Sequence, residues 1–121
     1  MVLSKEKMDD IQRLIVSTLS QYEWNDSKKL KSLLSDIIPT ERLLIRLLLV
    51  SYEEGIFDDF QNVNDEKITT HRAIKKLVYE CGISEENAIW TVGVWRRIVG
   101  LSGEFEYKES TVYKGLHRVT V

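Results

Sequence analysis

The stretch “ERLLIRLLLVSYEEGI”, residues 41–56, decides how this chain folds. Apolar side chains cover nearly the whole circumference of a helix built on it, and only Arg42, Arg46 and Glu53 form a narrow polar strip. A helix that is apolar almost all round is normally buried among its neighbours. Residues 40–54 are therefore predicted to form the central helix of a bundle and its most buried element.

This helix ends in a glycine corner that recurs later in the chain. “YEEGI” and “YECGI” place Gly55 and Gly82 where a helix that stops needs a left-handed residue, and each glycine is followed by an isoleucine that can fold back on the last turn. An N-cap candidate follows each corner, Asp58 after the first and Ser84 after the second. The sequence therefore predicts two helix–glycine–helix corners.

Apolar residues also recur at helical spacing on both sides of the central helix. We expect Asn25 or Asp26 to cap a helix that Pro39 ends, and Thr40 to cap the central helix. The predicted fold class is all-α, a compact bundle of about five helices around the helix 40–54. The other helical segments are expected at residues 4–22, 26–38, 70–81 and 85–100, with a short helical turn at 57–60.

The pattern changes after Gly100. Phe105 and Tyr107 alternate with charged residues, and a run rich in β-branched and aromatic residues follows them. We therefore expect a helical bundle domain over residues 1–101 and a C-terminal tail over residues 102–121. The tail is predicted to be either extended or folded as a β-hairpin.

Composition narrows the classes of function. The chain has 121 residues, with 17 Lys and Arg against 19 Asp and Glu and a formal net charge of −2. The length fits one domain, and the charge balance gives no general attraction for a phosphate backbone. Residues 1–12 lack the apolar segment of a signal peptide, and the longest apolar run, residues 43–50, is too short to cross a bilayer. We therefore expect a cytoplasmic protein without membrane contact.

The residue pattern does not favour catalysis, a metal or a cofactor. His71 and His117 do not share a helix face, so metal-ligand spacing is missing. The single cysteine, Cys81, lies on an apolar helix face, where an inert core thiol is expected. The six glycines are scattered and form no phosphate-binding loop. We expect that the chain is not an enzyme and has no cofactor.

The stretch “IWTVGVWRRIVGL”, residues 89–101, is the candidate recognition surface. On a helix, Trp95 lies in line with small and β-branched apolar residues and is expected in the core. Trp90 lies at the edge of this apolar arc, and Ile89 and Arg96 point further out. Because this mixture is enriched at interfaces, we expect Trp90 to be partly exposed, and covered by a partner protein, a second copy or the tail. The predicted interface residues are Ile89, Trp90, Arg96, Arg97, Phe105 and Tyr107.

Nucleic acid binding is an alternative. Basic pairs such as Arg96–Arg97, and a glycine corner between two helices, are features of helix-turn-helix proteins. However, the second helix of that unit opens with Glu85 and Glu86, whose carboxylates would meet phosphates. Nucleic acid is therefore the less favoured partner. The alternative function is a small regulator or accessory protein, phage- or defence-related, or a nucleic-acid-binding helical protein.

Two blocks carry a family resemblance. “LKSLLSDIIPTERLLIRLLLVSYEEGIFDDF”, residues 30–60, has a Leu-rich helix, an Asp, a Pro, an Arg-containing helix and a closing Gly-Ile. “LVYECGISEENAIWTVGVWRRIVGL”, residues 77–101, has Gly-Ile, an acidic helix start, the pair Val92 and Trp95, and Gly100. Both resemble a small all-helical module that is appended to bacterial chaperone-like, kinase-like, zinc-ribbon and caspase-like signalling or conflict proteins. The resemblance implies a non-catalytic adaptor domain that docks other proteins, and it assigns no binding residues.

Overall fold

A computed structural model describes residues 3–107 of the chain. Within that range every regular element is helical and no strand is present, which confirms the predicted all-α class. No helix in this range is long and apolar enough to span a membrane. The predicted tail is described only as far as Tyr107, so the β-hairpin alternative and His117 lie outside the described residues.

The elements are α1 (Lys5–Gln21), α2 (Ser27–Ile37), α3 (Arg42–Glu53), α4 (Ile56–Gln61), α5 (Glu66–Lys75), the π-helical segment η1 (Lys76–Glu80) and α6 (Glu85–Ile98).

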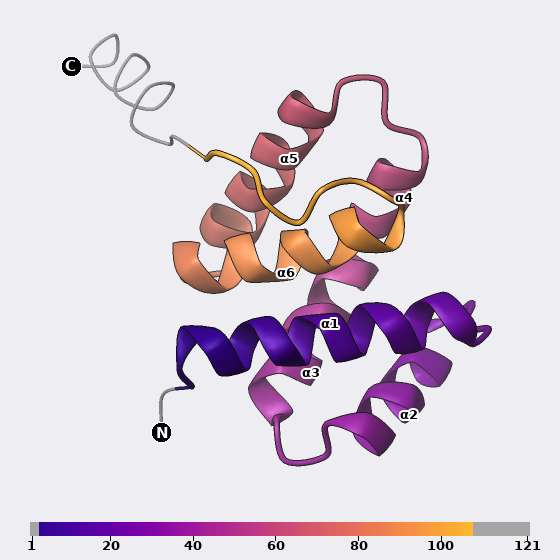
Figure 1. The fold of residues 1–121 in the computed structure, drawn as a ribbon. Helices are drawn as coiled ribbons and strands as arrows, with labels where there is room; N and C mark the ends of the chain where they lie inside the picture. Colours follow the sequence, from indigo (N-terminus) through magenta and orange to yellow (C-terminus); the bar gives the residue numbers. More distant parts are fainter. Residues whose placement is uncertain (1–2, 108–121) are drawn as a thin grey trace, which may run out of the picture.

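The helices pack in two pairs on either side of α1 and α6. These two helices lie side by side, with α2 and α3 on one side of them and α4 and α5 on the other (Figure 1). α6 contacts α1, α3, α4, α5 and η1, whereas α3 contacts α2, α4 and α6. After α6 the chain turns back and runs over α6 toward α5 (Figure 1). α6 therefore contacts more of the other elements than α3 does.

The helix predicted at the centre, residues 40–54, is present as α3. Leu47 and Leu48 are buried as predicted, but Leu43 is 57% exposed because one side of α3 faces no other helix. The expectation that this helix is the most buried element is wrong. α6 buries more of its residues, and they include polar and small ones such as Thr91 and Gly93. A helix with many apolar residues is therefore not always the most buried one, because burial depends on how many elements surround the helix.

Both predicted glycine corners are confirmed. Gly55 and Gly82 have φ angles of +82° and +69°, in the left-handed region. The predicted cap Ser84 is also confirmed, since its Oγ accepts a hydrogen bond from the backbone N–H of Asn87 at 3.2 Å. The cap predicted at Asp58 is wrong: α4 begins directly after the glycine, so Asp58 lies inside its first turn.

Two other predicted helix starts also need correction. The cap predicted at Thr40 is wrong, because Glu41 occupies the N-cap position of α3 and its side chain makes no capping hydrogen bond. The helix predicted from residue 70 begins earlier, at Glu66. Its cap is Asp65, whose Oδ1 accepts hydrogen bonds from the N–H groups of Lys67 and Ile68. Asp26 caps α2, which is one of the two predicted alternatives.

The core is built around Trp95, which is fully buried as predicted. Its indole N–H donates to the Ser51 hydroxyl at 2.7 Å, so the polar atom of the ring is satisfied inside the core. Three aromatic rings surround it at centroid distances of 5.1 to 6.2 Å, and they belong to Trp24, Tyr52 and Phe57. This aromatic cluster joins α6 to α3, α4 and the loop after α1.

Candidate functional site

Arg96, predicted to point outward, is buried. The residue is 2% exposed, and its guanidinium donates to the Ser102 carbonyl at 2.9 Å and to the Thr70 hydroxyl at 2.8 Å. The ring of Phe105 lies 4.9 Å from the guanidinium carbon. The predicted outward direction is wrong because the chain reverses at Gly100, where φ is +92°, and brings residues 101–107 back over this face of α6.

Trp90 is also less exposed than predicted. It is 8% exposed, and its indole N–H donates to the Met8 carbonyl of α1 at 3.0 Å. The Gln12 amide of the same helix donates to the Trp90 carbonyl at 3.0 Å. Gly93 permits this approach, since a Cβ there would lie 3.1 Å from the Gln12 amide nitrogen. The expected partial exposure is wrong because α1 packs directly along α6.

The other predicted interface residues are divided between two groups. Arg97 donates to the Gln12 carboxamide oxygen at 2.8 Å and so belongs with Trp90 at the α1–α6 contact. Phe105 packs on Arg96, and the Tyr107 ring lies 5.1 Å from the ring of His71 on α5. Ile89 is partly buried against the core. The structure therefore uses most of this predicted surface to hold its own residues 101–107 and α1.

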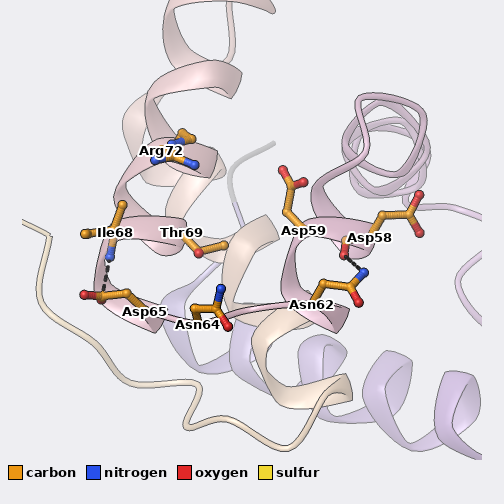
Figure 2. A pocket seen from close by; sticks show the side chains of 8 residues that line it. All are labelled: Asp58, Asp59, Asn62, Asn64, Asp65, Ile68, Thr69 and Arg72. Carbon is orange, nitrogen blue, oxygen red and sulfur yellow. Dashed lines mark hydrogen bonds between the residues drawn. The ribbon is translucent and has the colours of Figure 1, made fainter.

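A polar pocket of about 410 Å³ lies between α4 and α5 (Figure 2). Two of its polar side chains, those of Asp65 and Asn62, serve the local structure. Asp65 caps α5, and the Asn62 amide donates to the Asp58 carbonyl at 3.3 Å. Within residues 3–107 no group of three or more His, Cys, Asp or Glu side chains is arranged to hold a metal ion. The pocket is lined by Asp58, Asp59, Asn62, Asn64, Asp65, Ile68, Thr69 and Arg72.

A groove of about 410 Å³ between α2 and α3 has a different character. Its walls carry the cationic side chains of Lys31, Arg42 and Arg46, all of them exposed. Its apolar lining consists of buried Ile45, partly buried Leu49 and the exposed ring of Pro39, and Ser35 completes the wall on the α2 side. We refer to this site as the α2–α3 groove.

The cations of the α2–α3 groove have no acidic partner. In the described part of the chain no ion pair involves Lys31, Arg42 or Arg46, whereas Arg13–Asp10, Lys76–Glu54 and Arg96–Glu66 are paired elsewhere. Glu41 occupies the N-cap position of α3, and its carboxylate offsets the positive end of the helix dipole, so the positive potential comes from the three side chains. The groove is therefore a concave positive surface with an apolar floor.

Sequence reasoning missed this groove, although part of its signal was present. The polar strip of Arg42 and Arg46 on an otherwise apolar helix was recognised, and Lys31 lies one helix earlier. Periodicity gives the direction of a side chain on its own helix and not the packing of two helices. The convergence of the three cations follows only from the way α2 and α3 pack against each other.

The one cysteine is a poor nucleophile in this environment. Partial burial raises the pKa of the Cys81 thiol, and the carboxylates of Glu54 and Glu80 raise it further against the opposing effect of Lys76. The thiolate is the reactive form of cysteine, and a raised pKa lowers its population at neutral pH. The side chain packs against the core as a partly buried residue.

Comparison of the chain with protein-family models, with curated proteins and with solved structures found no match. The resemblance of residues 30–60 and 77–101 to an adaptor module therefore stays a prediction. The α2–α3 groove brings together cations from two helices, none of which forms an ion pair in the described residues, over an apolar floor. A second pocket that carries cations is lined by residues of α5 alone: Lys67, Ile68, His71, Arg72 and Lys75.

Proposed function

We propose that this chain is a non-catalytic protein-interaction module and that the α2–α3 groove is its docking site. The observation that carries the proposal is the convergence of Lys31, Arg42 and Arg46 around an apolar floor without an acidic partner. The adaptor role in a bacterial signalling or conflict context, which the family resemblance implies, belongs to the same proposal. We also propose that the protein is located in the cytoplasm.

The arrangement of the three cations is unfavourable for the isolated chain. Arg42 and Arg46 are one helical turn apart, and like charges at this spacing destabilise a helix by about 0.2–0.5 kcal/mol. Lys31 adds a third positive charge from the opposite wall. An anionic ligand bound between the three cations would be attracted to each of them, and this attraction would offset their mutual repulsion. Arginine beside apolar side chains is also a typical composition for a protein interface.

The composition of the groove favours a protein over a nucleic acid. None of its lining residues is aromatic, so it offers no ring on which a base can stack. The chain as a whole carries a net charge of −2, which does not attract a phosphate backbone. The apolar floor of Ile45 and Leu49 matches the side chains of a protein ligand.

The proposal is tested by comparing two charge-reversed variants as baits for proteins from the source cells. Arg42→Glu/Arg46→Glu changes the groove, and Lys67→Glu/Arg72→Glu makes the same change in charge on α5, across the molecule (Figure 1). We expect a partner that the wild type and the α5 variant retain and the groove variant loses. Identical sets of retained proteins for all three baits would contradict the proposal.

Folding is controlled separately. Circular dichroism and thermal unfolding of both variants should match the wild type, because all four changed side chains lie on the surface. Surface substitutions of this kind usually change stability by within about 0.5 kcal/mol.

A further inference from the structure

We infer that the α2–α3 groove binds an acidic amphipathic helix of a partner protein. This inference rests on the proposed function and adds the chemical class of the partner. Three features of the groove carry it: the spacing of its cations, its apolar floor and its position along two neighbouring helices. Each feature matches one property of such a helix.

The cations are spaced to meet carboxylates on a helix. Arg42 and Arg46 occupy successive turns of α3, so their side chains leave the helix about 5–6 Å apart. Two Glu residues at positions i and i+4 of a partner helix have the same spacing. Lys31 stands on the α2 wall, where it can meet a third carboxylate on the other flank of the ligand. Arginine can bind a carboxylate through two parallel hydrogen bonds, and this fixes the orientation of the carboxylate in addition to attracting its charge.

The floor of the groove supplies the apolar half of the interaction. Ile45 is 8% exposed and Leu49 is partly buried, so both present a limited apolar surface at the bottom of the groove. Leu43 does not line the groove, but it is 57% exposed, and its spacing of three residues from Arg46 places the two side chains next to each other on α3, so it adds an apolar side chain at the edge of the groove. A leucine of the ligand placed between its acidic residues would reach this floor. This is the helix-in-groove mode of recognition, in which apolar anchors of a helix enter a groove between other helices.

Other anions explain fewer of these features. A phosphate group or a nucleic acid backbone uses the cations but gains nothing from Ile45, Leu49 and the exposed Leu43. A flexible acidic peptide uses the cations but lacks the fixed spacing that two arginines one turn apart recognise. The amphipathic acidic helix uses all three features.

The inference is tested by fluorescence anisotropy with a labelled synthetic peptide of about 15 residues, a length near the minimum for a stable helix. Its Glu residues repeat at i and i+4, with Leu between them on the same face. A second peptide of the same composition places Glu and Leu on opposite faces. A labelled single-stranded oligonucleotide and a duplex serve as competing anions. All binding measurements use the full chain of 121 residues.

We expect the first peptide to bind the wild type, and Arg42→Glu/Arg46→Glu to weaken its binding by at least about tenfold, the equivalent of about 1.4 kcal/mol. Lys31→Glu, on the other wall, should weaken binding independently. The matched variant Lys67→Glu/Arg72→Glu should bind as the wild type does. The rearranged peptide should bind at least about tenfold more weakly, because it loses either its ion pairs or its apolar contact.

Four outcomes would overturn the inference. Equal binding of both peptides would exclude a helical ligand. An oligonucleotide that binds more tightly and displaces the peptide would assign the groove to nucleic acid. A wild-type dimer that Arg42→Glu/Arg46→Glu dissociates would assign it to a second copy. If no peptide binds while the groove variant still loses a captured partner, the partner chemistry is wrong and the proposed function stands.

Discussion

Arg96 holds the C-terminal segment against α5 and α6. The guanidinium is almost fully buried, donates to Thr70 and Ser102, and lies over the ring of Phe105. Its ion pair with Glu66 is long, at 3.8 Å, and the Glu66 side chain is 46% exposed, so this pair contributes little. The buried hydrogen bonds dominate, because a hydrogen bond to a charged group contributes about 1.5–3 kcal/mol.

Arg96→Ala is therefore expected to destabilise the fold by about 2–4 kcal/mol and to release residues 101–107. Arg96→Lys should recover little of this, because an ammonium group cannot reproduce the planar fork of the guanidinium. Chemical denaturation measures the first effect, and limited proteolysis near Phe105 measures the second. If Arg96→Ala unfolds with wild-type stability and its residues 101–107 stay protected from proteolysis, this segment is held by other contacts.

Cys81 should react slowly at neutral pH. Its pKa is raised by burial, Glu54 and Glu80, so a smaller fraction is thiolate at pH 7 than in an unperturbed cysteine. Alkylation by iodoacetamide should accelerate as pH rises and continue to do so beyond the pH at which a free cysteine levels off. Glu54→Gln removes one of the raising charges and should increase the rate at pH 7 to 8. A rate at pH 7 equal to that of free cysteine would contradict the raised pKa.

At the scale of elements, the two glycine corners set where the helices end. A Cβ built at Gly55 meets no atom within 4 Å, so the space around it is open. The restriction comes from its φ of +82°, which L-residues adopt at a cost of about 1–2 kcal/mol. The requirement for glycine here is therefore conformational and not steric.

Substitutions at Gly55 should consequently follow backbone preference and not side-chain size. Gly55→Ala is expected to cost about 1 kcal/mol, Gly55→Asn less, and Gly55→Val more, because asparagine tolerates the left-handed region and β-branched residues do not. Equilibrium denaturation of the three variants gives the order. An asparagine variant less stable than the valine variant would show that the corner does not need a left-handed residue.

At the scale of the whole molecule, the sequence predicted the parts that depend on one helix at a time. Periodicity predicted α1, α2, α3 and α6, and the glycines predicted where α3 and η1 end, because these signals lie within a few residues of the element they describe. Trp95 was correctly assigned to the core because the apolar face of its own helix contains it.

The errors concern contacts between distant segments. Trp90 is covered by α1, whose Met8 is 82 residues away, and Arg96 is covered by a segment that reverses after Gly100. The α2–α3 groove depends on the packing of two helices. Helical periodicity describes the faces of one helix and gives no information on which other segment covers each face, so the candidate site was the least predictable part of the molecule.

The most direct test of the docking site is a photo-crosslinking experiment in the source cells. A photoreactive phenylalanine analogue at Leu43, which is 57% exposed and lies next to Arg46 on α3, would report contact at the edge of the groove. The same analogue at Ile68, which is 53% exposed on α5, is the matched control. We expect position 43 to form a crosslinked product with a partner protein that disappears when Arg42→Glu/Arg46→Glu is added, and position 68 to form none. A product at position 68 and none at position 43 would contradict the assignment of the α2–α3 groove as the docking site.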